Sequence, residues 1–200
     1  MMRRFTEVEA VAALLDRDNI DTDQVIPARY LSRPRAAGVG ECLFRDLRFD
    51  GNGNEKPDFV LNRDGYRNAK VIVAGPNFGC GSSRENAVWA LYDYGIRAVI
   101  APSTGDIFYN NSIKNGLLPI FLPDAACNGL MAQIVELPGS KIAVDLVSQT
   151  VQGPDGSKHH FEIDPFPKEC LLNGLDEIAY TLTLADQISA FEARYIRDNV

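Results

Sequence analysis

The sequence has few of the side chains that hydrolytic and metal-dependent sites usually need. Its only two histidines, His159 and His160, are adjacent and follow a Gly- and Pro-containing stretch that predicts a solvated hairpin turn. No histidine stands apart as a general base and no G-x-S-x-G nucleophile elbow occurs, so a Ser-His-Asp hydrolase is disfavoured. The cysteines lie roughly forty residues apart, which fits neither a zinc site nor the ligand run of an iron–sulfur cluster, and we predict no metal ligands in this chain. They are Cys42, Cys80, Cys127 and Cys170.

Long apolar stretches and an excess of basic residues are also absent. No run approaches the roughly 20 apolar residues that cross a bilayer, and the start, Met-Met-Arg-Arg-Phe-Thr-Glu, lacks the apolar segment of a signal peptide. The chain has 20 Lys and Arg residues and 27 Asp and Glu residues, so its net charge is −7. This charge disfavours nucleic acid and anionic membranes as partners. We expect a cytoplasmic protein, and its length suits a single domain over residues 1–200.

An acidic segment, Asp16 to Asp23, is similar to a calcium loop in composition only. The sixth position is Asp21 rather than glycine and the twelfth is Pro27 rather than glutamate, so the EF-hand spacing fails. Two interpretations remain: a polar turn held by side-chain to backbone hydrogen bonds, or carboxylates that point into a site.

Short apolar runs that alternate with helical patterns predict an α/β fold. Strands are expected at 71–74, 98–101 and 117–122, with helices between them at 84–94 and 104–114. Such alternation predicts parallel pairing, with helices packed on the sheet.

The rest of the chain predicts antiparallel additions and irregular segments. Residues 8–15 predict another strand, and 142–151 pairs with 160–163 as a β-hairpin, which makes the central sheet mixed and only partly parallel. Residues 184–196 predict an amphipathic closing helix. Residues 28–44 combine arginines, glycines and apolar residues without a regular period and predict a mobile functional loop, and residues from about 50 to 58 predict a polar linker.

The most informative segment is residues 77–85, Asn-Phe-Gly-Cys-Gly-Ser-Ser-Arg-Glu, here called the serine loop. It connects the strand at 71–74 to a helix, and the first N–H groups of a helix lack internal partners and carry partial positive charge. Gly79 and Gly81 allow a ligand to approach the backbone closely. The loop is therefore a candidate site for an anion.

A purely structural interpretation of the serine loop has to be weighed against this one. Ser82 followed by Glu85 has the spacing of a capping box. Arg84 argues against capping alone, since a cation in the first helical turn opposes the dipole by roughly 0.3 to 1 kcal/mol unless an anion binds there. The loop contains no P-loop lysine and lacks the third glycine of a dinucleotide fingerprint.

Several motifs together resemble the swivelling domain of the aconitase superfamily. They are Asp21-Thr22-Asp23 with Val25-Ile26-Pro27, Gly79-x-Gly81-Ser82-Ser83-Arg84-Glu85, Asp106-Ile107-Phe108, Asn115-Gly116-Leu117-Leu118-Pro119 and Asn173-Gly174-Leu175-Asp176. Within the superfamily the chain is similar to the small subunits of bacterial 3-isopropylmalate dehydratase. One departure is Asn86, where relatives often carry histidine.

The resemblance implies a swivelling β/β/α domain and a hydro-lyase active only with a large subunit. That enzyme isomerises 2-isopropylmalate and 3-isopropylmalate through isopropylmaleate in leucine biosynthesis, on a [4Fe–4S] cluster expected on the large subunit. The alternatives are the small subunit of a homoaconitase or of a citraconate or dimethylmalate dehydratase, and a non-enzymatic anion-binding module.

The resemblance also implies roles for individual residues toward a small dicarboxylate substrate. Ser82 is the base that removes a proton from the carbon α to a carboxylate, and Ser83 and Arg84 bind carboxylate. Arg33 or Arg35 is expected to be the second carboxylate clamp, and Asp23 to orient a base of the partner chain. The residues expected to receive the isopropyl group are Tyr30, Leu31, Pro34 and Val39.

The free energy needed to deprotonate the serine indicates that the chain alone is inert. If the serine hydroxyl resembles water, lowering its pKa from about 15.7 to about 7 requires roughly 12 kcal/mol. A helix terminus supplies up to ~2 kcal/mol and a nearby arginine ~4 kcal/mol, so about half of the requirement must come from elsewhere.

Overall fold

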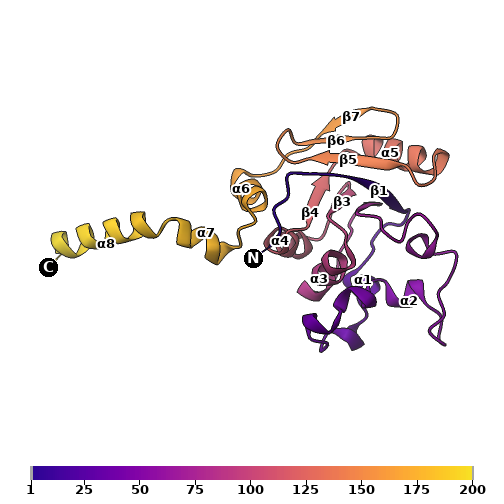
Figure 1. Cartoon of the computed structure of the whole chain (residues 1–200), viewed down its shortest axis with the longest axis horizontal. Coiled ribbons are helices and arrows are strands. Elements are labelled where there is room, and N and C mark those ends of the chain that lie inside the picture. The colour runs from indigo at the N-terminus through magenta and orange to yellow at the C-terminus, as the bar shows by residue number, and fades with distance from the viewer. Residues whose placement is uncertain (1, 200) are drawn as a thin grey trace.

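The computed structural model describes residues 2–199, and side chains as far as residue 195. Residues 1 and 200 of the predicted domain, and the side chain of Ile196 in the predicted closing helix, lie outside this description. One seven-stranded sheet has the order β4-β3-β2-β1-β5-β6-β7 (Figure 1). The strands are β1 (Glu7–Leu15), β2 (Val71–Ala74), β3 (Ala98–Ala101), β4 (Leu118–Phe121), β5 (Lys141–Asp145), β6 (Thr150–Gln152) and β7 (Lys158–His160).

The parallel half of the sheet, β1 to β4, is buried on both faces. Along β2, Ile72 belongs to one hydrophobic cluster while Val71 and Val73 belong to the other, as the alternation of side chains in a strand requires. All four residues of β2 and of β3 are buried, which explains why these strands read as continuous apolar runs. The predicted parallel pairing is confirmed.

Helices cover both faces of this sheet. The α3 and α4 helices make the crossovers from β2 to β3 and from β3 to β4, and Figure 1 shows α3 next to α1 and α2 on one side of the sheet, with α5 beside β5 to β7. The mixed, partly parallel α/β fold expected from the sequence is therefore confirmed. The helices are α1 (Thr22–Val25), α2 (Arg45–Arg48), α3 (Glu85–Tyr94), α4 (Asp106–Asn115), α5 (Asp124–Glu136), α6 (Pro165–Asn173), α7 (Glu177–Thr183) and α8 (Ala185–Asn199).

The predicted loop at 28–44 contains three short 3-10 helices, at Ala28–Tyr30, Arg35–Ala37 and Val39–Cys42. Its first half lies at the surface, whereas Val39 is fully buried and belongs to the core cluster under α3. Val39 is thus a core residue in this structure, and the expectation that it receives a substrate side chain is not supported.

The antiparallel half differs from the predicted hairpin. A turn divides the expected strand at 142–151 into β5 and β6, because Asp145 accepts hydrogen bonds from the backbone N–H groups of Val147 and Ser148 and Gln149 has a φ of 55°. The turn after β6 is where the sequence predicts it, with Gly153 N–H donating to the Ser157 carbonyl at 2.9 Å. The result is a three-stranded meander.

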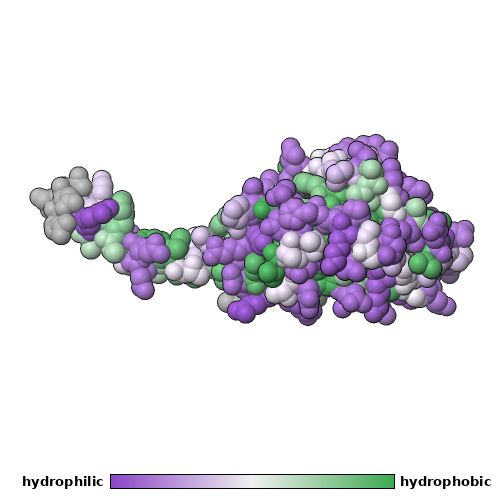
Figure 2. Space-filling model, turned by 90° about the horizontal axis from the view of Figure 1, so that it is seen from above, coloured by the Kyte–Doolittle hydropathy of each residue, from purple (hydrophilic) through white to green (hydrophobic). Residues whose placement is uncertain are grey.

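Two predicted segments remain, the polar linker and the closing helix. Residues 50–58 form a turn folded against the body, with Glu55 in a two-point ion pair with Arg67 at 2.8 and 2.6 Å. The predicted closing helix exists as α8, but α7 and α8 extend away from the body (Figures 1 and 2). None of the helices in the described part of the chain is long and apolar enough to span a bilayer.

Candidate active site

The serine loop leaves the carboxyl end of β2 and is held by the loops that follow the neighbouring strands. Gly79 N–H donates to the Ile20 carbonyl at 2.7 Å, on the β1 side. On the β3 side, the backbone of Phe78 pairs with the segment at 103–105 at 3.1 and 2.9 Å. The loop therefore lies at the carboxyl edge of three adjacent parallel strands, the position where open α/β sheets usually bind ligands.

Both glycines of the serine loop are required by its geometry. Gly79 has a φ of +70° and Gly81 a φ of +91°, and L-residues pay a steric penalty in this region. At Gly79 an added Cβ would also overlap the ring of Phe108, the buried residue of the first turn of α4. At Gly81 the nearest atom would be 3.6 Å away, so only the backbone angle restricts that position.

The two glycines predict different losses of stability. Gly79→Ala should lower the free energy of unfolding by about 2 to 5 kcal/mol, which combines ~1–2 kcal/mol for the backbone angle with ~1–3 kcal/mol for overpacking against Phe108. Gly81→Ala, the matched control, should lower the free energy of unfolding only by the contribution of the backbone angle. Urea unfolding at a constant m-value measures both. Equal losses in the two variants would contradict the packing argument.

The serine hydroxyls do not cap the helix. The N-cap residue of α3 is Arg84, and no side chain bonds to the helix start. Ser82 and Ser83 are exposed, and among the described residues neither hydroxyl has a hydrogen-bond partner. The capping-box interpretation is therefore excluded, and two free hydroxyls are left beside a helix N-terminus.

Arg84 is paired with Asp23 across 61 residues of sequence. Its Nη2 atom donates to Asp23 Oδ2 at 2.8 Å, and Nη1 donates to the second carboxylate oxygen. The Arg84 side chain is 14% exposed, whereas that of Asp23 is 56% exposed. The bond from Arg84 holds the pKa of Asp23 below its ordinary value, so the pair is ionised at neutral pH.

The acidic segment before α1 forms a polar turn and also contributes to the site. Asp21 caps α1 by accepting from Gln24 N–H at 2.7 Å, as the polar-turn interpretation expects. Asp23 points to Arg84 instead, as the other interpretation expects. Thr22 was quoted only as part of a motif and was given no role, yet it is buried and its Oγ1 donates to the Ser82 carbonyl at 2.9 Å. Its position between Asp21 and Asp23 was the one sequence feature that could have indicated a role in the site.

Asn115, at the end of α4, belongs to a motif of the sequence analysis but was given no role there. Its Nδ2 donates to Glu85 Oε1 at 2.8 Å, and its Oδ1 accepts from Trp89 Nε1 at 3.0 Å. It therefore fixes the first residue of α3 relative to α4. Asn86, the departure from the family pattern, donates to the Leu31 carbonyl at 3.3 Å.

The structure does not bring Arg33 or Arg35 to the serines. Arg33 binds the Ala37 carbonyl and Glu41 within its own loop. Arg35 forms a two-point ion pair with Asp93 at 2.9 and 2.7 Å, near the opposite end of α3, roughly 12 Å along the helix at 1.5 Å per residue. Arg35 Nη1 also donates to Asn115 Oδ1 at 3.4 Å. A substrate contact by either arginine stays a prediction.

The described residues contain no group of three or more His, Cys, Asp or Glu side chains placed to hold a metal ion. All four cysteines are free thiols, and three of them are buried. Burial raises the pKa of Cys127 to about 11, so this thiol is protonated at neutral pH.

Comparison with known proteins identifies the family of this chain. Residues 2–125 match the family model of the aconitase C-terminal domain, and residues 129–165 match the LeuD_N model. The chain is 54% identical over 193 residues to the 3-isopropylmalate dehydratase small subunit of Rhodospirillum centenum, covering 96% of this chain and 95% of the relative. It is 51% identical to the small subunit of Dinoroseobacter shibae, covering 96% of both chains.

A solved structure supports the same assignment. The crystal structure of a 3-isopropylmalate dehydratase from Methanocaldococcus jannaschii DSM2661 matches with a TM-score of 0.63 and 28% identity, over 93% of this chain and 99% of that chain. The similarity thus extends over nearly the whole sequence and includes the strands and loops that hold the serines. The chain belongs to the family of 3-isopropylmalate dehydratase small subunits, within the aconitase superfamily.

Proposed function

We propose that this chain is the small subunit of a cytoplasmic hydro-lyase that interconverts 2-isopropylmalate and 3-isopropylmalate through isopropylmaleate in leucine biosynthesis. The observation that carries the proposal is the pair of free hydroxyls, Ser82 and Ser83, next to Arg84 at the start of α3. The relatives whose sequences match this chain nearly end to end are named as small subunits of that enzyme.

Each residue of the site has a separate task in this proposal. Ser82 removes the proton from the carbon α to a carboxylate, and Ser83 and Arg84 bind that carboxylate with help from the helix N-terminus. Asp23 holds the guanidinium in place and leaves Nε and the outer Nη hydrogens available, because its two oxygens engage only Nη1 and Nη2. Arg33 or Arg35 supplies the second clamp if the loop at 28–44 moves.

The site is incomplete without another protein. Asp23 neutralises Arg84, so the ~4 kcal/mol that a free arginine would give toward deprotonating Ser82 is largely unavailable. The helix terminus, in an exposed position, offers at most ~2 kcal/mol of the roughly 12 needed.

We infer that the large subunit holds the [4Fe–4S] cluster and closes over the serine loop. The thiols of the described residues are dispersed and mostly buried, and so do not suit cluster ligation. When bound by the large subunit, the cluster supplies Lewis acidity toward the substrate hydroxyl and carboxylate.

Reconstitution tests the proposal directly. The chain is mixed with an iron-loaded large subunit of the same enzyme, and isopropylmaleate is followed by its ultraviolet absorbance with 2- or 3-isopropylmalate as substrate. We expect turnover from the mixture and none from either subunit alone. Activity of this chain by itself, without iron, would contradict the proposal.

The same assay separates the alternatives. Faster turnover of homocitrate-type, citraconate or dimethylmalate substrates would assign the chain to a sister dehydratase. No turnover with any substrate, despite a stable complex, would favour a non-enzymatic anion-binding module.

A further inference from the structure

A basic cavity lies at the end of the sheet opposite to the serine loop. It has a volume of about 690 Å³, within the range of small-molecule sites. Its wall includes Lys70, which directly precedes β2, and Arg97, which directly precedes β3. Since the serine loop follows β2, the cavity and the candidate active site occupy opposite ends of the parallel strands.

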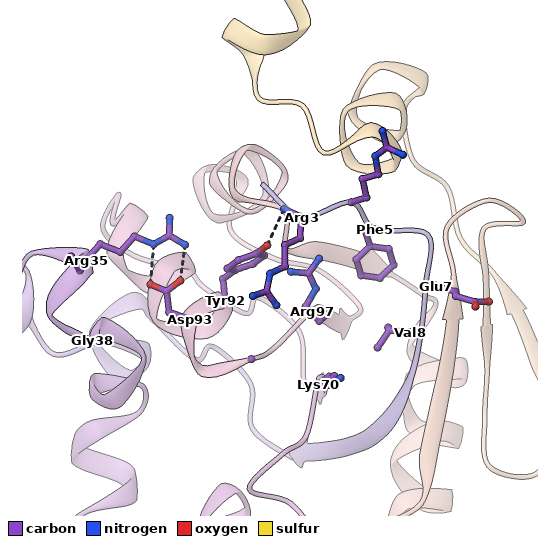
Figure 3. A pocket seen from close by; sticks show the side chains of 13 residues that line it. Arg3, Phe5, Glu7, Val8, Arg35, Gly38, Lys70, Tyr92, Asp93 and Arg97 are labelled. Carbon is purple, nitrogen blue, oxygen red and sulfur yellow. Dashed lines mark hydrogen bonds and ion pairs between the residues drawn. The ribbon is translucent and has the colours of Figure 1, made fainter. Parts of the chain in front are cut away.

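The charge of the cavity is positive in a chain whose net charge is −7. One of its two carboxylates, Asp93, is taken by the two-point pair with Arg35. The other, Glu7, points away from the cavity in Figure 3. The cationic side chains of the wall are Arg3, Arg4, Arg35, Lys70 and Arg97. Apart from Arg35, none of them has a carboxylate partner among the described residues.

Three of these cations converge from different parts of the chain. Figure 3 shows the guanidinium groups of Arg3 and Arg97 beside the ring of Tyr92. Lys70 also lines the cavity, and its carbonyl accepts from Arg97 N–H at 2.7 Å. The Arg97 guanidinium lies 4.6 Å from the Tyr92 ring centroid, and the Tyr92 hydroxyl accepts from Arg3 N–H at 3.3 Å. Stacking on Tyr92 orients Arg97 without neutralising its charge.

A structural explanation accounts for only part of this arrangement. The carboxyl end of α3 reaches the cavity at Gly95, and a cation near such an end is favoured by the helix dipole. That effect explains one cation, Arg97. It does not explain why Arg3 and Lys70, from two other segments, face the same space without an acidic partner, because like charges that share a site repel each other.

We propose that this cavity binds a small multivalent oxyanion, carrying either several carboxylates or a phosphoryl group, through Arg3, Lys70 and Arg97. Guanidinium groups suit both kinds of oxyanion, since they donate two parallel hydrogen bonds to either. The aromatic and apolar wall, with Phe5 and Val8, suits an anion that has an organic body. The proposal does not depend on the proposed dehydratase function.

Calorimetry on the full-length chain at low ionic strength tests it. The probes are citrate, pyrophosphate and inorganic phosphate, with acetate as the monovalent control. We expect citrate or pyrophosphate to bind, acetate not to bind, and Arg97→Gln to weaken binding by about tenfold or more, as for a lost charge-assisted bond. Arg97→Lys, which keeps the charge, should weaken it less. Arg194→Gln on α8 has the same charge change away from the cavity and should have no effect.

The variants also separate this cavity from the serine loop. Arg84→Gln should leave the affinity unchanged if the anion binds at the cavity. Binding by citrate alone would identify polycarboxylates, and binding by pyrophosphate and phosphate alone would identify phosphoryl anions. The proposal is overturned if no probe binds up to millimolar concentration, or if Arg84→Gln weakens binding while folded Arg97→Gln and Lys70→Gln do not.

Discussion

The Ser82→Ala variant should retain less than about a thousandth of the wild-type kcat when combined with the large subunit, because it removes the proposed general base. Its hydroxyl is exposed and makes no hydrogen bond to another described residue. The substitution should therefore change the free energy of unfolding by less than about 0.5 kcal/mol. Steady-state kinetics of the reconstituted enzyme and urea unfolding of the variant measure the two quantities.

Ser83→Ala is the matched control for this prediction. It removes an identical hydroxyl, also exposed, one residue away, but one whose proposed task is to bind the substrate carboxylate. We expect KM to rise by about tenfold or more, as for a lost hydrogen bond to a charged group, with a smaller effect on kcat. If Ser83→Ala abolished turnover and Ser82→Ala did not, the two roles would have to be exchanged.

The parts of the fold that the sequence predicts correctly are those governed by local pattern. The strands at 71–74 and 98–101 are apolar throughout because helices cover both faces of the sheet. The helix at 85–94 ends at Gly95, whose N–H donates to the carbonyl groups of Leu91 and Tyr92. These features require only short-range information and strong burial.

The wrong or missing predictions depend on side chains far apart in sequence or on weak turn signals. An Asx-type turn at Asp145 divides an alternating run that otherwise resembles one strand. The pair of Asp23 with Arg84 and the pair of Arg35 with Asp93 are set by the tertiary fold. The periodicity of the sequence does not predict either pair. For the same reason the basic cavity, assembled from three separate segments, was not predicted.

The Asp23–Arg84 pair has a consequence for substrate binding. In this structure an internal carboxylate occupies one edge of the guanidinium, so a substrate carboxylate must use the remaining donors or displace Asp23. Because Asp23 is more than half exposed, its pair with Arg84 is screened by water and is weak enough to be exchanged. A substrate carboxylate shielded from water by a partner subunit would interact more strongly with the same guanidinium.

Arg84→Lys should consequently reduce kcat/KM by about a hundredfold or more while the subunits still associate. A lysine ammonium keeps the charge but has no planar fork, so it cannot hold Asp23 and a substrate carboxylate in fixed positions together. Reconstituted kinetics and gel filtration of the complex measure the two effects. Arg67→Lys changes the other two-point pair, with Glu55, and as a control should leave kinetics unaltered. Unchanged activity in Arg84→Lys would remove Arg84 from the site and leave Ser82 without its proposed carboxylate anchor.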